Sequence, residues 1–329
     1  FDDGAGGGTA NNGVLDGTEA GVPNVTVELY TSTGTFVSST TTGATGHYQF
    51  DLLNPGTYYT FIPAVEFQSG GDLFTYYSSV GNNANETSDE LTGPTTNENG
   101  VDDAAPATNG IRSTNFALLA GTESTTDDDT GYTGTLPDSS VNFTDDFGFT
   151  QKYSIGNRVW FDTNNGSTIN GAEVGVDGVT VNLYAASNLT VILATDTTSN
   201  GGYYLFDDLY PGDYVVSVAA SNFTGVLNGY WSSGTSRTAA GVITETAPAL
   251  ANSDTDSDDN GTLQTAGLLN GAVISSTVTL GPSGNTEPTL ETNLEPVVGQ
   301  GNQTDGRANM TVDFGFYKTE IGNLVFADA

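Results

Sequence analysis

Residues 155–166 of the chain read IGNRVWFDTNNG. Val159 and Phe161 alternate with Arg158 and Trp160, which predicts a strand that packs on both faces. A loop rich in acidic and amide side chains follows, and the chain then returns to an apolar alternation, VTVNLY, that is typical of a second strand. The segment therefore indicates a strand, a polar loop and another strand.

The loop between the two strands carries oxygen-bearing side chains at regular places. Asp162, Asn164, Asn170 and Glu173 occupy its relative positions one, three, nine and twelve. Carboxylate and amide oxygens at this spacing can surround a hard cation such as Ca²⁺. The same residue types also favour turns without any metal. The sequence predicts a calcium site here, with an ordinary polar turn as the alternative.

The chain repeats itself. Three pairs of segments match each other: 15–30 with 169–184, 47–58 with 203–214, and 146–149 with 313–316. In the second pair, a strand is expected to end at a Pro-Gly turn, after which the next strand begins. The period of about 160 residues indicates tandem repeats. We expect one repeat at residues 1–153, a second at 154–320, and the opening strand of a further repeat at 321–329.

Composition excludes several classes of protein. The formal charge of −34, with 6 Lys and Arg residues in 329, argues against nucleic acid as a partner. No run of 18 apolar residues exists that would insert into a membrane, and the absence of Cys excludes disulfides and thiolate chemistry. Short alternating runs between turn residues are typical of an all-β protein. No nucleophile and base recur together, so we expect no enzyme.

The repeats resemble the calcium-binding B repeats of serine-aspartate-repeat surface proteins, and more broadly the collagen-adhesin B-type domains. The residues that carry the resemblance are the Ile-Gly-Asn strand at Ile155, the Gly-Val-x-x-Val-Thr-Val stretches at Gly21 and Gly175, the Pro-Gly-x-Tyr turns and the Asp-Phe-Gly-Phe ends. The resemblance implies tandem immunoglobulin-like Greek-key β-sandwich domains placed head to tail, Ca²⁺ at the connecting loops, and a stalk or spacer role outside the cell. The loop departs from the family pattern at Gly166, where the family usually carries Asp or Asn.

Further candidate metal ligands follow from the repeats. The first repeat and the final strand offer Asp2, Asn12, Asp16, Glu19 and Asp328. A separate acidic stretch resembles the first half of an EF-hand loop and offers Asp254, Asp256, Asp258 and Asn260. Its twelfth position is Gly267, so the bidentate Glu of an EF-hand is missing. A solvated acidic loop is the alternative to a second calcium site there.

The function that these patterns favour is mechanical. We expect a Ca²⁺-stiffened rod at the cell surface that continues into further copies of itself, through a longer tandem array or through strand donation between chains. A module that binds a glycan or a host-surface protein is the alternative. It would need an exposed aromatic cluster, for which the first candidates are Tyr76, Tyr77, Tyr230 and Trp231.

Overall fold

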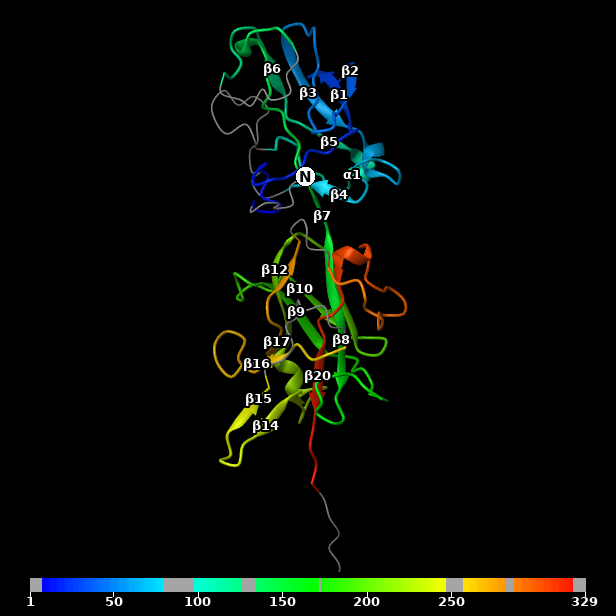
Figure 1. Ribbon diagram of the computed structural model, residues 1–329, viewed down its shortest axis with the longest axis vertical. Coiled ribbons are helices and arrows are strands. Elements are labelled where there is room, and N and C mark those ends of the chain that lie inside the picture. Colours follow the sequence, from blue (N-terminus) through cyan, green and yellow to red (C-terminus); the bar gives the residue numbers. More distant parts are fainter. Residues whose placement is uncertain are drawn as a thin grey trace, which may run out of the picture. The chain divides into compact units, whose positions relative to one another are not determined.

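The computed structural model describes residues 8–79, 98–125, 134–171, 173–246, 257–281 and 287–321. The chain divides into two compact units (Figure 1). Unit 1 comprises Phe1–Lys152 and Gly281–Asn285, and unit 2 comprises Tyr153–Leu280 and Thr286–Ala329. Strands dominate both units, while the helices are single short turns. The prediction of an all-β fold is confirmed.

Unit 2 is a complete β-sandwich. Its strands are β8 (Tyr153–Phe161), β9 (Thr180–Ala185), β10 (Ala194–Thr197), β11 (Tyr203–Leu209), β12 (Gly212–Val218), β13 (Trp231–Ser232), β14 (Thr235–Arg237), β15 (Ile243–Glu245), β16 (Thr262–Leu263), β17 (Val273–Ile274), β18 (Val278–Leu280), β19 (Ala308–Asn309) and β20 (Phe314–Tyr317). One sheet has the order β10-β9-β12-β17-β16, with β18 also on β12. The other has the order β11-β8-β20-β13, with β19 also on β8. The short 3-10 helices η4 (Ala220–Thr224) and η5 (Asp305–Arg307) lie in the connections.

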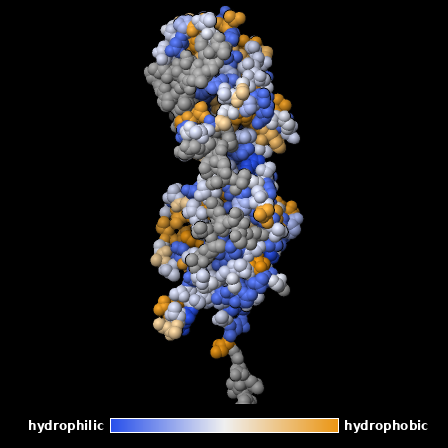
Figure 2. All heavy atoms as spheres, in the orientation of Figure 1, coloured by the Kyte–Doolittle hydropathy of each residue, from blue (hydrophilic) through white to orange (hydrophobic). Residues whose placement is uncertain are grey.

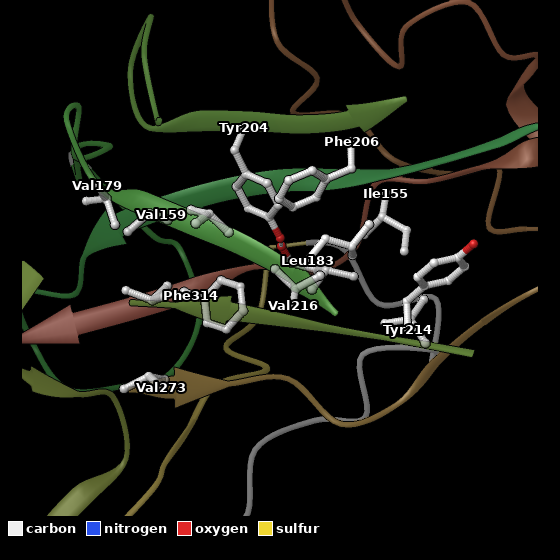
Figure 3. Close-up of a cluster of buried hydrophobic side chains, with 14 of the residues drawn as sticks. Ile155, Val159, Val179, Leu183, Tyr204, Phe206, Tyr214, Val216, Val273 and Phe314 are labelled. Carbon is white, nitrogen blue, oxygen red and sulfur yellow. Dashed lines mark hydrogen bonds between the residues drawn. The ribbon is translucent and has the colours of Figure 1, made fainter. Parts of the chain in front are cut away.

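The core of unit 2 lies between these two sheets (Figure 3). Ile155 and Val159 of β8 face Leu183 of β9 and Val216 of β12, and all four side chains are fully buried. The alternation read from the sequence places them there, because successive residues of a strand point to opposite faces. Trp160 points to the other face of β8 and is also fully buried, so the strand packs on both faces as predicted.

The glycine of the Gly-Val-x-x-Val motif has a steric role. A Cβ atom on Gly175 would lie 1.6 Å from the carbonyl oxygen of Gly201. Gly202, at φ +91°, lies on the other side of this contact. Its carbonyl accepts the backbone N–H of Val159 at 2.8 Å. The close approach of two backbones explains why this motif requires glycine. Gly21 meets the backbone of Thr45 in the same manner in unit 1.

Unit 1 repeats most of this arrangement. Its strands are β1 (Thr26–Thr31), β2 (Phe36–Thr41), β3 (Gly56–Ile62), β4 (Tyr76–Ser78), β5 (Ile111–Arg112), β6 (Phe116–Leu118) and β7 (Phe149–Gln151), with η2 (Ala64–Phe67), α1 (Pro106–Asn109) and η3 (Asp138–Ser140) between them. The first sheet has the order β2-β1-β3-β5, with β6 also on β3, and β4 pairs with β7. By sequence, β1, β3 and β7 correspond to β9, β12 and β20.

One expected strand is absent from unit 1. Residues 203–209 form β11 as predicted, but the matching residues 47–53 form no strand. In unit 2, β11 pairs with β8. No strand in the described part of unit 1 corresponds to β8, so residues 47–53 lack the neighbour that a strand requires. The prediction of a strand there was wrong for that reason, although the apolar pattern is the same.

Candidate metal centre

Asp162 anchors the loop that follows β8. Its side chain is 1% exposed, and both carboxylate oxygens accept hydrogen bonds. Oδ1 accepts the backbone N–H groups of Asn164 at 3.2 Å and Gly166 at 3.1 Å. Oδ2 accepts the N–H of Ser167 at 2.9 Å and the hydroxyl of Ser233 at 2.8 Å. The loop thus wraps around one buried carboxylate and is tied through Ser233 to the segment after β13.

The other three predicted ligands belong to the same network. The side-chain amide of Asn164 donates to Oδ1 of Asn170 at 3.2 Å. Glu173 closes the loop, because its Oε2 accepts the N–H of Asn170 at 3.0 Å and its Oε1 accepts the N–H of Thr163 at 2.7 Å. The structure therefore brings Asp162, Asn164, Asn170 and Glu173 into one loop, as the spacing predicts.

The second acidic stretch lies beside this loop. Thr168 and Asp258 form an antiparallel bridge, the N–H of Ile169 donates to the carbonyl of Ser257 at 2.8 Å, and the N–H of Asp259 donates to the carbonyl of Ser167 at 3.0 Å. The sequence treats the two stretches as separate sites. In the fold they form one acidic region at the end of β8.

Three further acidic residues help to build this region and were missed from the sequence. Asp313 accepts the N–H of Arg158 at 2.8 Å through Oδ1 and the N–H of Ser257 at 3.0 Å through Oδ2. Asp259 accepts the N–H of Gly315 at 2.9 Å, and Glu245 accepts the N–H of Leu263 at 2.9 Å. The internal repeat could have identified two of them, because unit 1 has an acidic residue at the position that matches Asp313 and at the position that matches Asp259.

The electrostatics of the region are unfavourable for so many carboxylates. Burial raises the pKa of Asp259 well above its ordinary value, and the negative charges of Glu245 and Asp162 raise it further. Oε1 of Glu245 is buried and has no hydrogen-bond partner among the described residues. A cation in the region would offset this charge, and the donor set of carboxylate, amide and carbonyl oxygens is the kind that Ca²⁺ prefers. The residue types suit Ca²⁺, and its binding at this loop stays a prediction.

Comparison with known proteins decides the family. The sequence matches the profile of the SdrD B-like domain over residues 8–97 and 153–281. The chain belongs to the SdrD B-like domain family. The resemblance seen in the sequence is thereby confirmed, and with it the immunoglobulin-like sandwich expected of both repeats.

Two relatives of this SdrD B-like chain come from staphylococci. Over 210 residues, 63% of the chain, it is 30% identical to serine-aspartate repeat-containing protein F of Staphylococcus epidermidis and 32% identical to the bone sialoprotein-binding protein of Staphylococcus aureus strain MRSA252. The chain spans 10% of the first relative and 14% of the second. The family is one of surface proteins, and the chain is accordingly a cell-surface protein.

Among solved structures, the chain is similar to GBS52, the minor pilin of Streptococcus agalactiae. The match is 12% identical, has a TM-score of 0.23, and covers 95% of this chain and 91% of the pilin. In the described part of the chain, no helix combines the length and apolar character needed to cross a membrane.

The loop of the first SdrD B-like repeat is closed in the same way as the Asp162 loop. Oε2 of Glu19 accepts the N–H of Asp16 at 3.1 Å, which is the counterpart of the bond from Asn170 to Glu173. The side-chain amide of Asn12 donates to Oδ2 of Asp16 at 3.2 Å. Four predicted ligands lie outside the described residues: Asp2, Asp254, Asp256 and Asp328.

Neither SdrD B-like repeat gathers many acidic ligands at one point. Among the described residues, no three His, Cys, Asp or Glu side chains form a group that could hold a metal ion. The Asp162 loop supplies two carboxylates and two amides, and of the second stretch only Asp258 and Asn260 are described, with Asn260 donating to Asp258 at 3.3 Å. Any ion there would depend on amide and backbone oxygens as well as carboxylates.

The aromatic residues considered for an adhesive surface are largely engaged within their own units. Tyr230 stacks on Phe161 with ring centroids 4.4 Å apart, and the ammonium of Lys318 lies 5.4 Å from its centre. Lys152 lies 5.2 Å from the ring centre of Tyr77. Trp231 is 42% exposed. The residues thus offer one open ring, not a broad aromatic surface.

Proposed function

We propose that this chain is a structural segment of an extracellular stalk or fibre, built from repeated SdrD B-like sandwiches and stiffened by Ca²⁺. The observation that carries the proposal is the join between the two units. β7 ends at Gln151 and β8 begins at Tyr153, so one residue, Lys152, separates the last strand of one sandwich from a central strand of the next. A spacer of one residue leaves little freedom to a linker, which suits a stiff element.

Calcium has a defined place in this proposal. Asp162, Asn164, Asn170 and Glu173 would hold the ion in repeat 2, and Asn12, Asp16 and Glu19, with Asp2, would do so in repeat 1. The bound ion supplies positive charge that offsets carboxylate repulsion in a chain of net charge −34. Because an ion that binds only the folded form stabilises it by mass action, the loops would be locked in the conformation that the hydrogen bonds already favour.

The test is thermal melting of the full chain with Ca²⁺ and with a chelator. We expect Ca²⁺ to raise the melting temperature, and Glu173→Gln to reduce that rise in unit 2, because the substitution removes one of the two carboxylate ligands. Asp213→Asn is the matched control, since Asp213 lies exposed on β12 outside every predicted ligand loop. A melting temperature that is the same with Ca²⁺ and with chelator would remove the ion from the proposal.

A second candidate function is recognition of a glycan or host protein. Trp231 favours it, because an exposed indole on a short edge strand offers a flat surface for stacking. In the view of Figure 2, apolar residues lie scattered among hydrophilic ones. The chain has two tryptophans, and Trp160 is fully buried, so a ligand at Trp231 would change the fluorescence of the exposed indole. Trp231→Phe is the control that should not respond to any glycan. If the fluorescence of the wild-type chain is also unchanged by every glycan of a panel, this site does not bind a glycan.

A further inference from the structure

The connection between β9 and β10 carries a motif for covalent modification. Residues 188–190 read NLT, which is an Asn-x-Thr acceptor sequence for N-linked glycans. β9 ends at Ala185, β10 begins at Ala194, and β10 is the outermost strand of its sheet. The motif therefore lies on a connection at the edge of unit 2.

The motif forms a compact turn. Oδ1 of Asn188 accepts the backbone N–H of Thr190 at 3.1 Å and the hydroxyl of the same residue at 2.5 Å. The backbone N–H of Asn188 donates to the carbonyl of Ala185 at 2.9 Å, so the turn is attached to the end of β9. Asn188 and Thr190 are thus held in one arrangement, although neither belongs to a strand.

This turn affects the chemistry of the asparagine amide. The lone pair of an amide nitrogen is delocalised into its carbonyl, so Nδ2 becomes a good nucleophile only as it loses a proton. Negative charge then develops on Oδ1. The N–H and the hydroxyl of Thr190 already point at that oxygen, and donors fixed where charge develops stabilise it. The geometry therefore favours attack by Nδ2 of Asn188 on an electrophilic carbon.

Exposure makes the motif accessible to an enzyme. Asn188 and Thr190 are both exposed, and among the described residues none accepts a hydrogen bond from Nδ2 of Asn188. The three residues that follow, Val191, Ile192 and Leu193, are 51%, 49% and 52% exposed. A transferring enzyme can therefore reach both the acceptor and the chain on its C-terminal side.

Two other motifs form the same turn but are buried. Thr311 donates to Oδ1 of Asn309 through its N–H at 3.2 Å and its hydroxyl at 2.9 Å. Asn309 and Thr311 are 0% and 1% exposed. The matching motif of unit 1 joins Thr144 to Asn142 with both distances at 2.9 Å, and Thr144 is 2% exposed. These two turns belong to the interior and are closed to an enzyme in the folded chain.

Three more motifs of unit 2 have asparagines that are buried or engaged. Asn222 and Asn260 are 5% and 0% exposed. Nδ2 of Asn165 donates to the carbonyl of Thr235 at 3.1 Å, and its Oδ1 accepts the N–H of Gly234 at 2.8 Å. None of these three asparagines offers a free amide at the surface of the described structure.

Two further motifs are exposed but lack the turn. Asn24 is exposed, but Thr26 lies in β1 and its N–H donates to Oε1 of Glu66 at 3.1 Å. Asn302 is also exposed, and its N–H donates to Oδ2 of Asp207 at 2.8 Å. In neither of these described motifs does the threonine donate to the asparagine side chain. Within the described ranges, Asn188 alone combines exposure with the turn.

We propose that Asn188 is a glycan acceptor of the folded chain, and that its turn with Thr190 favours it over the other exposed motifs. The substrate is a sugar whose anomeric carbon carries a phosphate or diphosphate leaving group. Nδ2 forms a bond to the anomeric carbon, the bond from that carbon to the phosphate oxygen breaks, and a base of the transferring enzyme takes the proton from Nδ2. Nothing is oxidised or reduced.

The test treats the folded full chain with a soluble enzyme that transfers glucose from UDP-glucose to the Asn of Asn-x-Ser/Thr motifs. Mass spectrometry of the digested chain gives the rate at each asparagine, and synthetic peptides that span each motif give the rate for the sequence without the fold. We expect the ratio of chain to peptide rates to be about tenfold higher at Asn188 than at Asn24 or Asn302, which corresponds to the free energy of one hydrogen bond. Asn309 should be modified in its peptide and not in the folded chain.

Two variants assign the signal. Thr190→Ser keeps both donors and should keep the transfer, whereas Asn188→Gln should abolish it at this position. Circular dichroism of each variant checks that the sandwich is folded.

Two outcomes would overturn the proposal. In one, the folded wild-type chain acquires no glucose at Asn188. In the other, Asn188, Asn24 and Asn302 show equal ratios of chain to peptide rates, so that exposure selects the acceptor and the turn does not.

Discussion

The hydroxyl of Tyr204 donates a hydrogen bond to the carbonyl oxygen of Val312, 2.5 Å away and 108 residues later in the chain. Tyr204 is buried on β11, and Val312 precedes β20, so the bond passes across β8 and ties its two neighbours together. One hydrogen bond inside the apolar core thus joins β11 to the segment that precedes β20. The same carbonyl also accepts the backbone N–H of Asn157 at 3.1 Å, so it keeps one partner when the tyrosine hydroxyl is removed.

Removal of this hydroxyl should destabilise unit 2. We expect Tyr204→Phe to lower the free energy of unfolding by about 0.5–1.5 kcal/mol, the usual net contribution of one hydrogen bond. The measurement is urea denaturation followed by circular dichroism. Tyr203→Phe, on the opposite face of the same strand and only partly buried, is the control and should change the free energy much less. Equal effects of the two substitutions would refute a special role for the contact.

Alkaline pH should destabilise unit 2 through its buried tyrosines. Burial raises the pKa of Tyr204 well above its ordinary value of 10, and burial also raises the pKa of Tyr214 to about 12. A group whose pKa is raised on folding contributes stability that is complete below its unfolded pKa and is lost as pH rises through the folded value. We expect the free energy of unfolding to fall above pH 10.

An ultraviolet absorbance titration checks this prediction. The buried tyrosines should ionise only together with the loss of circular dichroism, and after the exposed tyrosines have titrated. Ionisation of every tyrosine near pH 10 in a folded chain would contradict it.

The glycine contact in unit 2 gives a steric prediction. Gly175→Ala would force a Cβ atom against the carbonyl of Gly201, so we expect this variant to fold poorly or not at all. Gly178→Ala is the matched control. Gly178 has φ +83° with open space around it, and alanine there costs only the backbone strain of about 1–2 kcal/mol. Thermal melting of both variants distinguishes the steric collision expected at residue 175 from the backbone strain expected at residue 178.

Equivalent core leucines of the two units should respond differently to the same truncation. Leu183 is fully buried in unit 2, and we expect Leu183→Ala to cost about 2–5 kcal/mol. Its counterpart Leu29 is 1% exposed but lines a cavity of about 1110 Å³ in unit 1, so Leu29→Ala should cost less. Denaturation of each variant at low protein concentration is the measurement. A larger cost for Leu29→Ala would indicate that the cavity is filled.

Local pattern predicted much of the fold. The alternation around Val159 and the spacing from Asp162 to Glu173 are properties of short segments, and the structure has both the strand and the connected loop. The strand expected at residues 47–53 shows where local pattern is insufficient. Residues 47–50 read HYQF and residues 203–206 read YYLF, yet only the second becomes a strand, because pairing depends on β8, a neighbour that is distant in sequence.

The candidate site was predictable only in part for a similar reason. Spacing along the chain identified Asn164 and Asn170, whose side chains meet within one loop. It did not reveal that Ser257 and Asp258 lie beside Thr168 and Ile169, since backbone hydrogen bonds there join segments that are about 90 residues apart in the sequence. Nor did it distinguish Asp259 from its acidic neighbours, because only burial in the fold sets this residue apart.

The pairing of β8 with β20 has a mechanical consequence. The chain enters unit 2 through β8 and leaves it through β20, and the two strands are parallel and directly hydrogen-bonded. Tension applied at the two ends of the unit would pull these strands past each other along their length. Their hydrogen bonds would then carry the force together, in shear, instead of opening one at a time, so the sandwich should resist stretching far better than its modest length of pairing would suggest.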